Sequence, residues 1–142
     1  MRGTGRILML GGMLLLLPAC GAKPGTVPVF PAKGRVFYQG RPTDGAIVQL
    51  HPRSPLPPGT PLPRGRVEAD GSFRLTTHVT NDGAPAGEYD VTITWRHPTE
   101  YAEQEGPDRI PARYGDPKLS GLSVRIEPQS NDLPEFRLAG KS

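Results

Sequence analysis

The chain has few of the residues that small proteins use to build disulfide-linked or helical cores. A single cysteine occurs in 142 residues, so no intrachain disulfide can form. Aromatic residues make up 6% of the chain and hydrophobic residues 35%, whereas glycine and proline each occur 18 times. Glycine and proline both oppose helix formation, so this composition excludes a helix-rich bundle. A chain of this length is expected to form one small domain.

A strong charge of either sign is also missing. The 17 Lys and Arg residues against 14 Asp and Glu residues give a formal charge of +3. Arg2 and Arg6 lie in an N-terminal segment that we expect to be removed on export, which leaves 15 basic and 14 acidic residues, a net charge of +1. That balance provides no strong positive electrostatic field that would attract nucleic acid or an anionic membrane. We therefore predict no nucleic-acid partner.

The apolar run over residues 7–17 is too short to span a bilayer, which takes roughly 20 apolar residues. Arg2 and Arg6 precede this run, and Pro18 follows it. A positively charged start before a short apolar run is typical of a secretory signal peptide. We therefore predict a signal peptide over residues 1–19.

The single cysteine stands directly after this segment, in Leu17-Pro18-Ala19-Cys20. The tetrapeptide resembles the lipobox of bacterial lipoproteins, whose signal peptidase cleaves before a cysteine after its thiol has been acylated. This resemblance implies that Cys20 becomes the lipidated first residue of the mature protein and anchors it to a membrane. Several acyl chains anchor stably, since each buried methylene contributes about 0.8 kcal/mol. An unmodified thiol beside an ordinary cleavage site, for example after Ala22, is the alternative.

Beyond the cysteine, the chain divides into a tether and a domain. Residues 20–33 alternate small residues with prolines, which predicts an extended tether. Residues 34–142 contain short segments in which apolar and polar residues alternate, separated by glycine and proline. In residues 88–96, for example, the odd-numbered positions are apolar. Asp70-Gly71, between two such segments, is typical of a β-hairpin turn.

These patterns predict an all-β fold, a single antiparallel β-sandwich of about seven strands. The regular alternation argues against global disorder. Pro134 interrupts the last segment and predicts an edge strand or a bulge there. Strands are expected near residues 35–38, 46–51, 66–69, 72–76, 88–96, 122–126 and 132–138.

Two connections are longer than turns. Residues 51–64 are rich in proline and should be stiff and polyproline-like. Residues 97–121 include Tyr101 and Tyr114, and they follow the strand that ends near Trp95. Binding residues are commonly found on long loops carried by a rigid scaffold.

Three stretches, at residues 34–52, 65–77 and 83–93, together resemble the carboxypeptidase-regulatory-like, or transthyretin-like, β-sandwich domain. The segments at residues 113–126 and 131–136 are similar to small exported lipoproteins abundant in planctomycetes. The resemblance covers residues 34–138, nearly all of the predicted domain. It implies an immunoglobulin-like two-sheet architecture, but it implies no activity, because one sandwich fold hosts many functions.

The residues give no pattern for catalysis or metal binding. His51, His78 and His97 are far apart in the sequence and have no metal-ligand spacing. No nucleophile stands beside a marked base. The acidic residues of the second long connection lack a calcium-loop pattern. Intradiol dioxygenases and hydroxyisourate hydrolases have similar sandwiches, but their paired histidines and Tyr-Arg-Gly-Ser ending are not found here. We therefore predict no catalytic residue, no metal and no cofactor.

The sequence favours a noncatalytic lipoprotein of the cell envelope, held outside the cytoplasm in the periplasm or on the outer membrane. It would act as a structural or interaction module whose partners are envelope proteins or polysaccharide. The alternative is a carbohydrate-binding accessory module in which Trp95, Tyr101 and Tyr114 stack on sugars. A flat, exposed cluster of these rings would favour the alternative, and buried rings would favour the interaction module.

Overall fold

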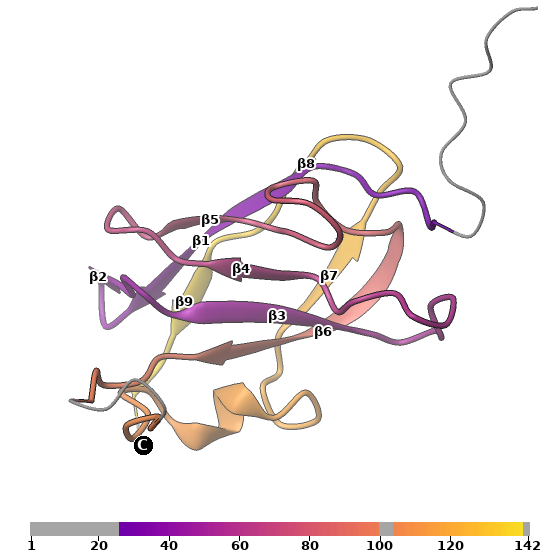
Figure 1. The fold of residues 1–142 in the computed structure, drawn as a ribbon. Coiled ribbons are helices and arrows are strands. Elements are labelled where there is room, and N and C mark those ends of the chain that lie inside the picture. The colour runs from indigo at the N-terminus through magenta and orange to yellow at the C-terminus, as the bar shows by residue number, and fades with distance from the viewer. Residues whose placement is uncertain (1–25, 100–103, 141–142) are drawn as a thin grey trace, which may run out of the picture.

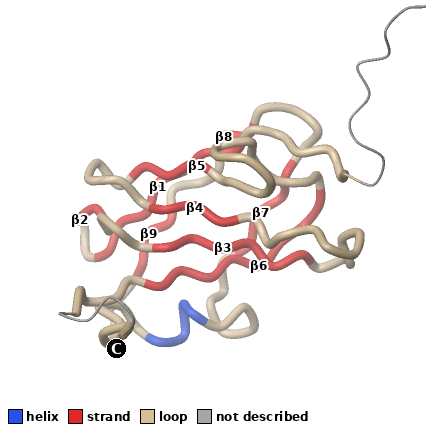
Figure 2. Tube along the Cα trace, in the orientation of Figure 1, coloured by secondary structure: helices blue, strands red, loops and turns tan. Residues whose placement is uncertain are grey.

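The computed structural model describes residues 26–99 and 104–140, which form two packed β-sheets (Figures 1 and 2). Seven strands have three or more residues: β1 (Ala32–Tyr38), β3 (Ile47–Pro52), β4 (Arg64–Arg66), β5 (Ser72–Arg74), β6 (Gly87–Thr94), β7 (Ser123–Ile126) and β9 (Phe136–Leu138). Two short strands, β2 (Arg41–Pro42) and β8 (Asn131–Asp132), and one 3-10 helix, η1 (Ala112–Gly115), complete the described elements. The predicted all-β sandwich is confirmed.

The first sheet is built around β1. Strands β5 and β2 pair with it antiparallel, whereas β8 and β9 pair with it in parallel. This sheet is therefore mixed, a departure from the purely antiparallel arrangement that we predicted. The segment predicted as one strand over residues 132–138 is split into β8 and β9 around Pro134, which has no N–H to donate to a ladder.

The second sheet is antiparallel, with the strand order β4-β3-β6-β7. Strand β6 lies inside it, and its apolar positions Tyr89, Val91 and Ile93 are buried, as the alternation predicted. The β4–β5 hairpin joins the two sheets, because Arg64 and Thr76 exchange backbone hydrogen bonds of 3.0 and 2.8 Å.

The turn of this hairpin is where the sequence placed it. Gly71 has a φ of +87°, a conformation that glycine adopts at little cost. The carboxylate of Asp70 accepts hydrogen bonds from the backbone N–H of Ser72 at 2.9 Å and from its hydroxyl at 2.6 Å. These bonds hold the pKa of Asp70 below its ordinary value, and the nearby charge of Arg35 adds to the effect.

The core lies between the sheets and includes Val36, Leu50 and Phe73, all of them almost fully buried. Tyr89 is 1% exposed, and its hydroxyl donates a 2.7 Å hydrogen bond to the carbonyl of Pro85, four residues upstream. A tyrosine near the start of a strand that bonds back to the preceding loop is the tyrosine corner of β-sandwiches. Burial raises the pKa of Tyr89 to about 12.

We predicted that the domain starts at residue 34, but the sandwich begins earlier in the chain. Strand β1 starts at Ala32. Phe30 exchanges backbone hydrogen bonds of 2.9 and 3.0 Å with Ala84. The last part of the predicted tether is therefore fixed to the domain. Within the described residues, no helix has the length and apolar character needed to cross a bilayer.

Candidate functional site

Trp95 follows the end of β6 and is half-buried against the core. Its indole N–H donates a 2.8 Å hydrogen bond to the carbonyl of Asp44. The Cζ atom of Arg109 lies 3.7 Å from the centre of the Trp95 ring, and the Tyr38 ring meets it edge-on with centroids 6.5 Å apart. One face of the indole is therefore covered by a guanidinium group from the second long connection.

Tyr114 lies on η1 and is 5% exposed, as part of the core cluster. Its hydroxyl accepts hydrogen bonds from the backbone N–H of Ala139 at 2.8 Å and from Nη2 of Arg113 at 3.0 Å. The guanidinium of Arg113 also lies over the ring, 4.6 Å from its centre. Tyr114 thus ties η1 to the C-terminal segment, and its ring offers no open face to a sugar.

Trp95 and Tyr114 therefore do not form the flat, exposed cluster that would favour sugar stacking. The other two predicted site residues, Tyr101 and Cys20, lie outside the residues that the structure describes. Ligand binding through the aromatic set and lipidation of Cys20 stay predictions.

The described part of the second long connection packs against the end of β6. The backbone N–H of Arg109 donates a 2.7 Å hydrogen bond to the carbonyl of Trp95. The Asp108 carboxylate accepts a 3.2 Å hydrogen bond from the Trp95 backbone N–H. Arg96 forms a 3.0 Å ion pair with Glu105. A hollow of about 400 Å³ lies beside these contacts, and Asp44 also lines it.

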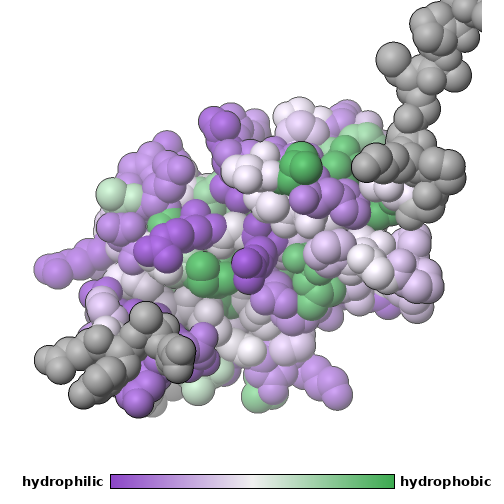
Figure 3. Space-filling view, in the orientation of Figure 1, coloured by the Kyte–Doolittle hydropathy of each residue, from purple (hydrophilic) through white to green (hydrophobic). Residues whose placement is uncertain are grey.

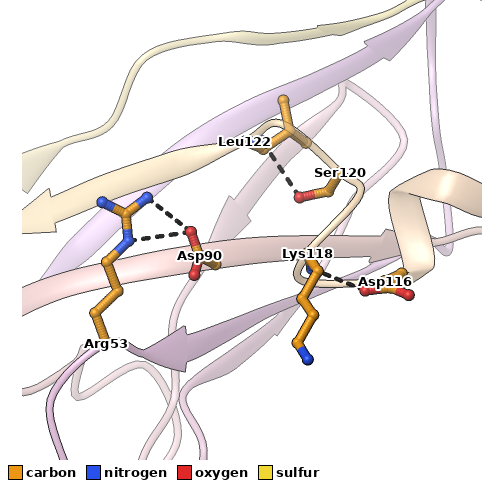
Figure 4. Close-up of polar contacts among 6 residues, drawn as sticks. All are labelled: Arg53, Asp90, Asp116, Lys118, Ser120 and Leu122. Carbon is orange, nitrogen blue, oxygen red and sulfur yellow. Dashed lines mark hydrogen bonds and ion pairs between the residues drawn. The ribbon is translucent and has the colours of Figure 1, made fainter.

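Two carboxylates, those of Asp90 and Asp116, form hydrogen bonds that hold the fold (Figure 4). Asp116, just after η1, accepts a 2.8 Å hydrogen bond from the backbone N–H of Lys118. On the second sheet, Oδ1 of Asp90 accepts hydrogen bonds from Nη2 and Nε of Arg53 at 2.7 and 3.1 Å. These bonds raise the pKa of Arg53. Both carboxylates therefore have a hydrogen-bond partner within the fold.

The histidines lie in separate surroundings. Nε2 of His51, on β3, lies 2.9 Å from the hydroxyl of Thr92, whereas His78 and His97 are exposed. Over residues 26–99 and 104–140, no group of three or more His, Cys, Asp or Glu side chains is placed to hold a metal ion.

Three arginines that were not identified from the sequence lie together in the structure. Arg64 and Arg66 of β4 and Arg74 of β5 line a hollow of about 810 Å³ on the outer surface. Figure 3 shows strongly hydrophilic side chains over β4, with smaller hydrophobic patches beside them. The pattern that could have identified this cluster is the alternate placement of arginines on both sides of the Asp70-Gly71 turn. Outward-facing residues on hairpin strands become neighbours when the hairpin closes.

Comparisons with known proteins do not add a function to this geometry. No family model matches the chain, and no curated protein matches it. The solved structure of a DUF3823 family protein from Parabacteroides merdae is similar to it with 18% sequence identity and a TM-score of 0.38. The match covers 80% of this chain and 46% of the other, so the chain spans less than half the length of that protein.

Proposed function

We propose that this protein is a noncatalytic lipoprotein of the cell envelope, anchored through Cys20, whose β-sandwich is a structural or interaction module. The observation that carries the proposal is the position of the single cysteine, directly after a short apolar run that follows two arginines. A segment of that kind directs export. Acylation of the cysteine would then convert a soluble domain into a membrane-held one.

The two-sheet architecture supports the finer part of the proposal, that the domain is of the carboxypeptidase-regulatory-like or transthyretin-like kind. The tyrosine corner at Tyr89 is a feature of β-sandwiches. The resemblance of residues 113–126 and 131–136 to planctomycete lipoproteins supports the same assignment.

The position of Phe30 limits how far the domain would stand from a membrane. Phe30 stands ten positions after Cys20 and is the first described residue with backbone hydrogen bonds to the sandwich. Ten extended residues reach at most about 35 Å. The second long connection (orange) lies at the end of the sandwich away from the first described residues (indigo) in Figure 1. An anchored domain would therefore hold that end away from the bilayer and open to partners.

The anchor is tested with Cys20→Ala in a bacterium that processes lipoproteins. The unsubstituted protein should incorporate radiolabelled palmitate and sediment with the membranes, whereas the variant should do neither. Ala22→Ser is the matched control, because it changes a neighbouring small residue without removing the thiol. An unsubstituted protein that takes up no label and is recovered in the soluble fraction would overturn the proposal.

A further inference from the structure

We infer that the hollow on the β4–β5 hairpin binds an acidic polysaccharide, whose carboxylates are held by Arg64, Arg66 and Arg74. This inference names a ligand class for the proposed interaction module and therefore rests on that function. It places the glycan on a different surface from the aromatic residues selected from the sequence.

The hairpin holds the three side chains in a fixed arrangement. Arg64 and Arg66 are exposed on either side of Gly65, which is buried. Two residues along a strand advance it by about 6.6–6.8 Å and return to the same face. Arg74 is exposed on β5, and a Cβ atom at Gly65 would lie 2.4 Å from its carbonyl oxygen. The two strands therefore run in close contact, and all three arginines line one hollow.

These arginines have no carboxylate partner in the part of the chain that the structure describes. Five other basic residues there form ion pairs within 4.0 Å: Lys33, Arg53, Arg96, Arg125 and Arg137. Arg64, Arg66 and Arg74 form none. An arginine presents a planar fork of donors that matches a carboxylate in bidentate fashion. Three such forks around one hollow are suited to an anionic ligand.

The remaining lining points to a sugar rather than to a dense polyanion. Asp44 and Glu68 also line the hollow, so its three arginines leave a net charge of only +1. Carboxylates, together with the amide of Asn81 and the hydroxyl of Thr80, are hydrogen-bonding partners for sugar hydroxyls. None of the described residues that line this hollow is aromatic, so they offer nucleic-acid bases no surface for stacking.

A second hollow adjoins the first and extends this surface. It measures about 610 Å³ and shares Glu68, Arg74 and Asn81 with the first. It continues across β5 to β1, where Lys33 and Arg35 line it together with the carboxylates of Asp70, Asp132 and Glu135. Its lining has three basic and four acidic residues in all, so the basic part of the surface is the first hollow, on β4 and β5. The two hollows together extend across β4, β5 and β1.

The test uses the full chain, purified in a nonionic detergent, and polygalacturonate as the probe. Arg64, Arg66 and Arg74 are replaced together by Gln. The control replaces Arg41, Lys118 and Arg125 by Gln, which removes the same charge from exposed positions outside both hollows. The unsubstituted protein should bind polygalacturonate and not neutral dextran. The hairpin variant should bind at least about tenfold more weakly, because it loses three charge-assisted contacts to the carboxylates. The control should bind within about twofold of the unsubstituted protein.

Three results would overturn the inference: no binding of polygalacturonate at low salt, an equal loss in the hairpin and control variants, or arginine-dependent binding of RNA or anionic vesicles in its place. Circular dichroism and Trp95 fluorescence show whether each variant keeps the fold. Lipidation of Cys20 is read by mass spectrometry in the same preparation, so failure of the glycan site and failure of the proposed anchor are distinguished.

Discussion

The guanidinium of Arg109 stacks on the indole of Trp95, with Cζ 3.7 Å from the ring centre. The same two residues are joined by a 2.7 Å backbone hydrogen bond. The second long connection is therefore fastened to the end of β6 by both main chain and side chain. The guanidinium therefore covers one face of the indole that we predicted could stack on a sugar.

Removing this cover should change the fluorescence of Trp95, the single tryptophan of the chain. We expect Arg109→Ala to red-shift the emission and to increase quenching by acrylamide, because water and quencher reach the exposed ring face. The free energy of unfolding should fall by about 0.5–1 kcal/mol, the usual contribution of an exposed cation–π contact. Lys118→Ala, an exposed charge elsewhere, is the control. Unchanged quenching in Arg109→Ala would show that the stack does not persist in solution.

The hydrogen bond from the Tyr89 hydroxyl should stabilise the folded protein, and Tyr89→Phe tests this. This change leaves the Pro85 carbonyl without its 2.7 Å donor, so we expect a loss of about 1–3 kcal/mol in urea unfolding. Tyr38→Phe is the control, because the structure gives the Tyr38 hydroxyl no hydrogen bond within the described residues.

The raised pKa of Tyr89 also predicts that the protein loses stability at alkaline pH. Burial raises its pKa from an ordinary value of 10.0 to about 12, so the folded state favours the neutral phenol. The resulting stability is fully present below pH 10 and is lost as the pH rises toward 12. The unsubstituted protein should lose more stability than Tyr89→Phe over that window. Parallel pH profiles for the two proteins would contradict this assignment.

Asp82 organises the loop after β5. Its carboxylate accepts hydrogen bonds from the backbone N–H groups of Thr77, His78 and Val79 at 2.7, 2.9 and 3.0 Å. Burial raises the pKa of this carboxyl, but the three donors outweigh that effect, so the pKa lies below its ordinary value of 3.8.

Asp82→Asn should therefore destabilise the protein at neutral pH by about 1–3 kcal/mol. The depressed pKa means that the contribution of Asp82 is present above about pH 3.8 and is lost as the pH falls through the folded-state pKa. The difference between the two proteins in thermal or urea unfolding should thus shrink in acid. Asp132→Asn, at an exposed position with a 3.6 Å ion pair, should have little effect. A difference of the same size at pH 7 and pH 3 would refute the role given to the charge.

Gly83 allows the N-terminal segment to dock. Its φ is +103°, and a Cβ atom there would lie 1.7 Å from the carbonyl oxygen of Phe30. We expect Gly83→Ala to lower the free energy of unfolding by on the order of 3 kcal/mol and to expose the segment around Phe30 to proteolysis. Gly59→Ala is the matched control, because Gly59 has a φ of +82° and an added Cβ would meet nothing within 4 Å. Equal losses in the two variants would mean that backbone conformation, and not the Phe30 contact, decides the effect.

Local patterns were sufficient for much of the fold. The alternation over residues 88–96 predicted β6 and its buried face, since side chains along a strand point alternately to opposite sides. Asp70-Gly71 predicted the hairpin turn because a glycine there supplies the positive φ. Pro134 predicted an edge strand or a bulge, and the structure divides the segment into β8 and β9 at that point.

Other features depend on contacts between residues far apart in the sequence. Alternation shows that Val36 and Phe136 face inward, but it does not show that they are partners in a parallel pair. The sequence left open whether Tyr114 is exposed or buried, because the loop sequence gives no sign that the backbone N–H of Ala139 would bind its hydroxyl.

By itself, the sequence determined the all-β class, the places of the main strands and turns, and the position of the single cysteine after an apolar run. Each of these follows from residues close together in the chain, whose spacing fixes which side chains share a face. Only the tertiary structure decided that Phe30 docks on Ala84, that Arg109 covers Trp95, and that three arginines of one hairpin, without an ion-pair partner among the described residues, line a single hollow. Such contacts depend on how the two sheets pack as a whole, and that packing sets distances that no local pattern specifies.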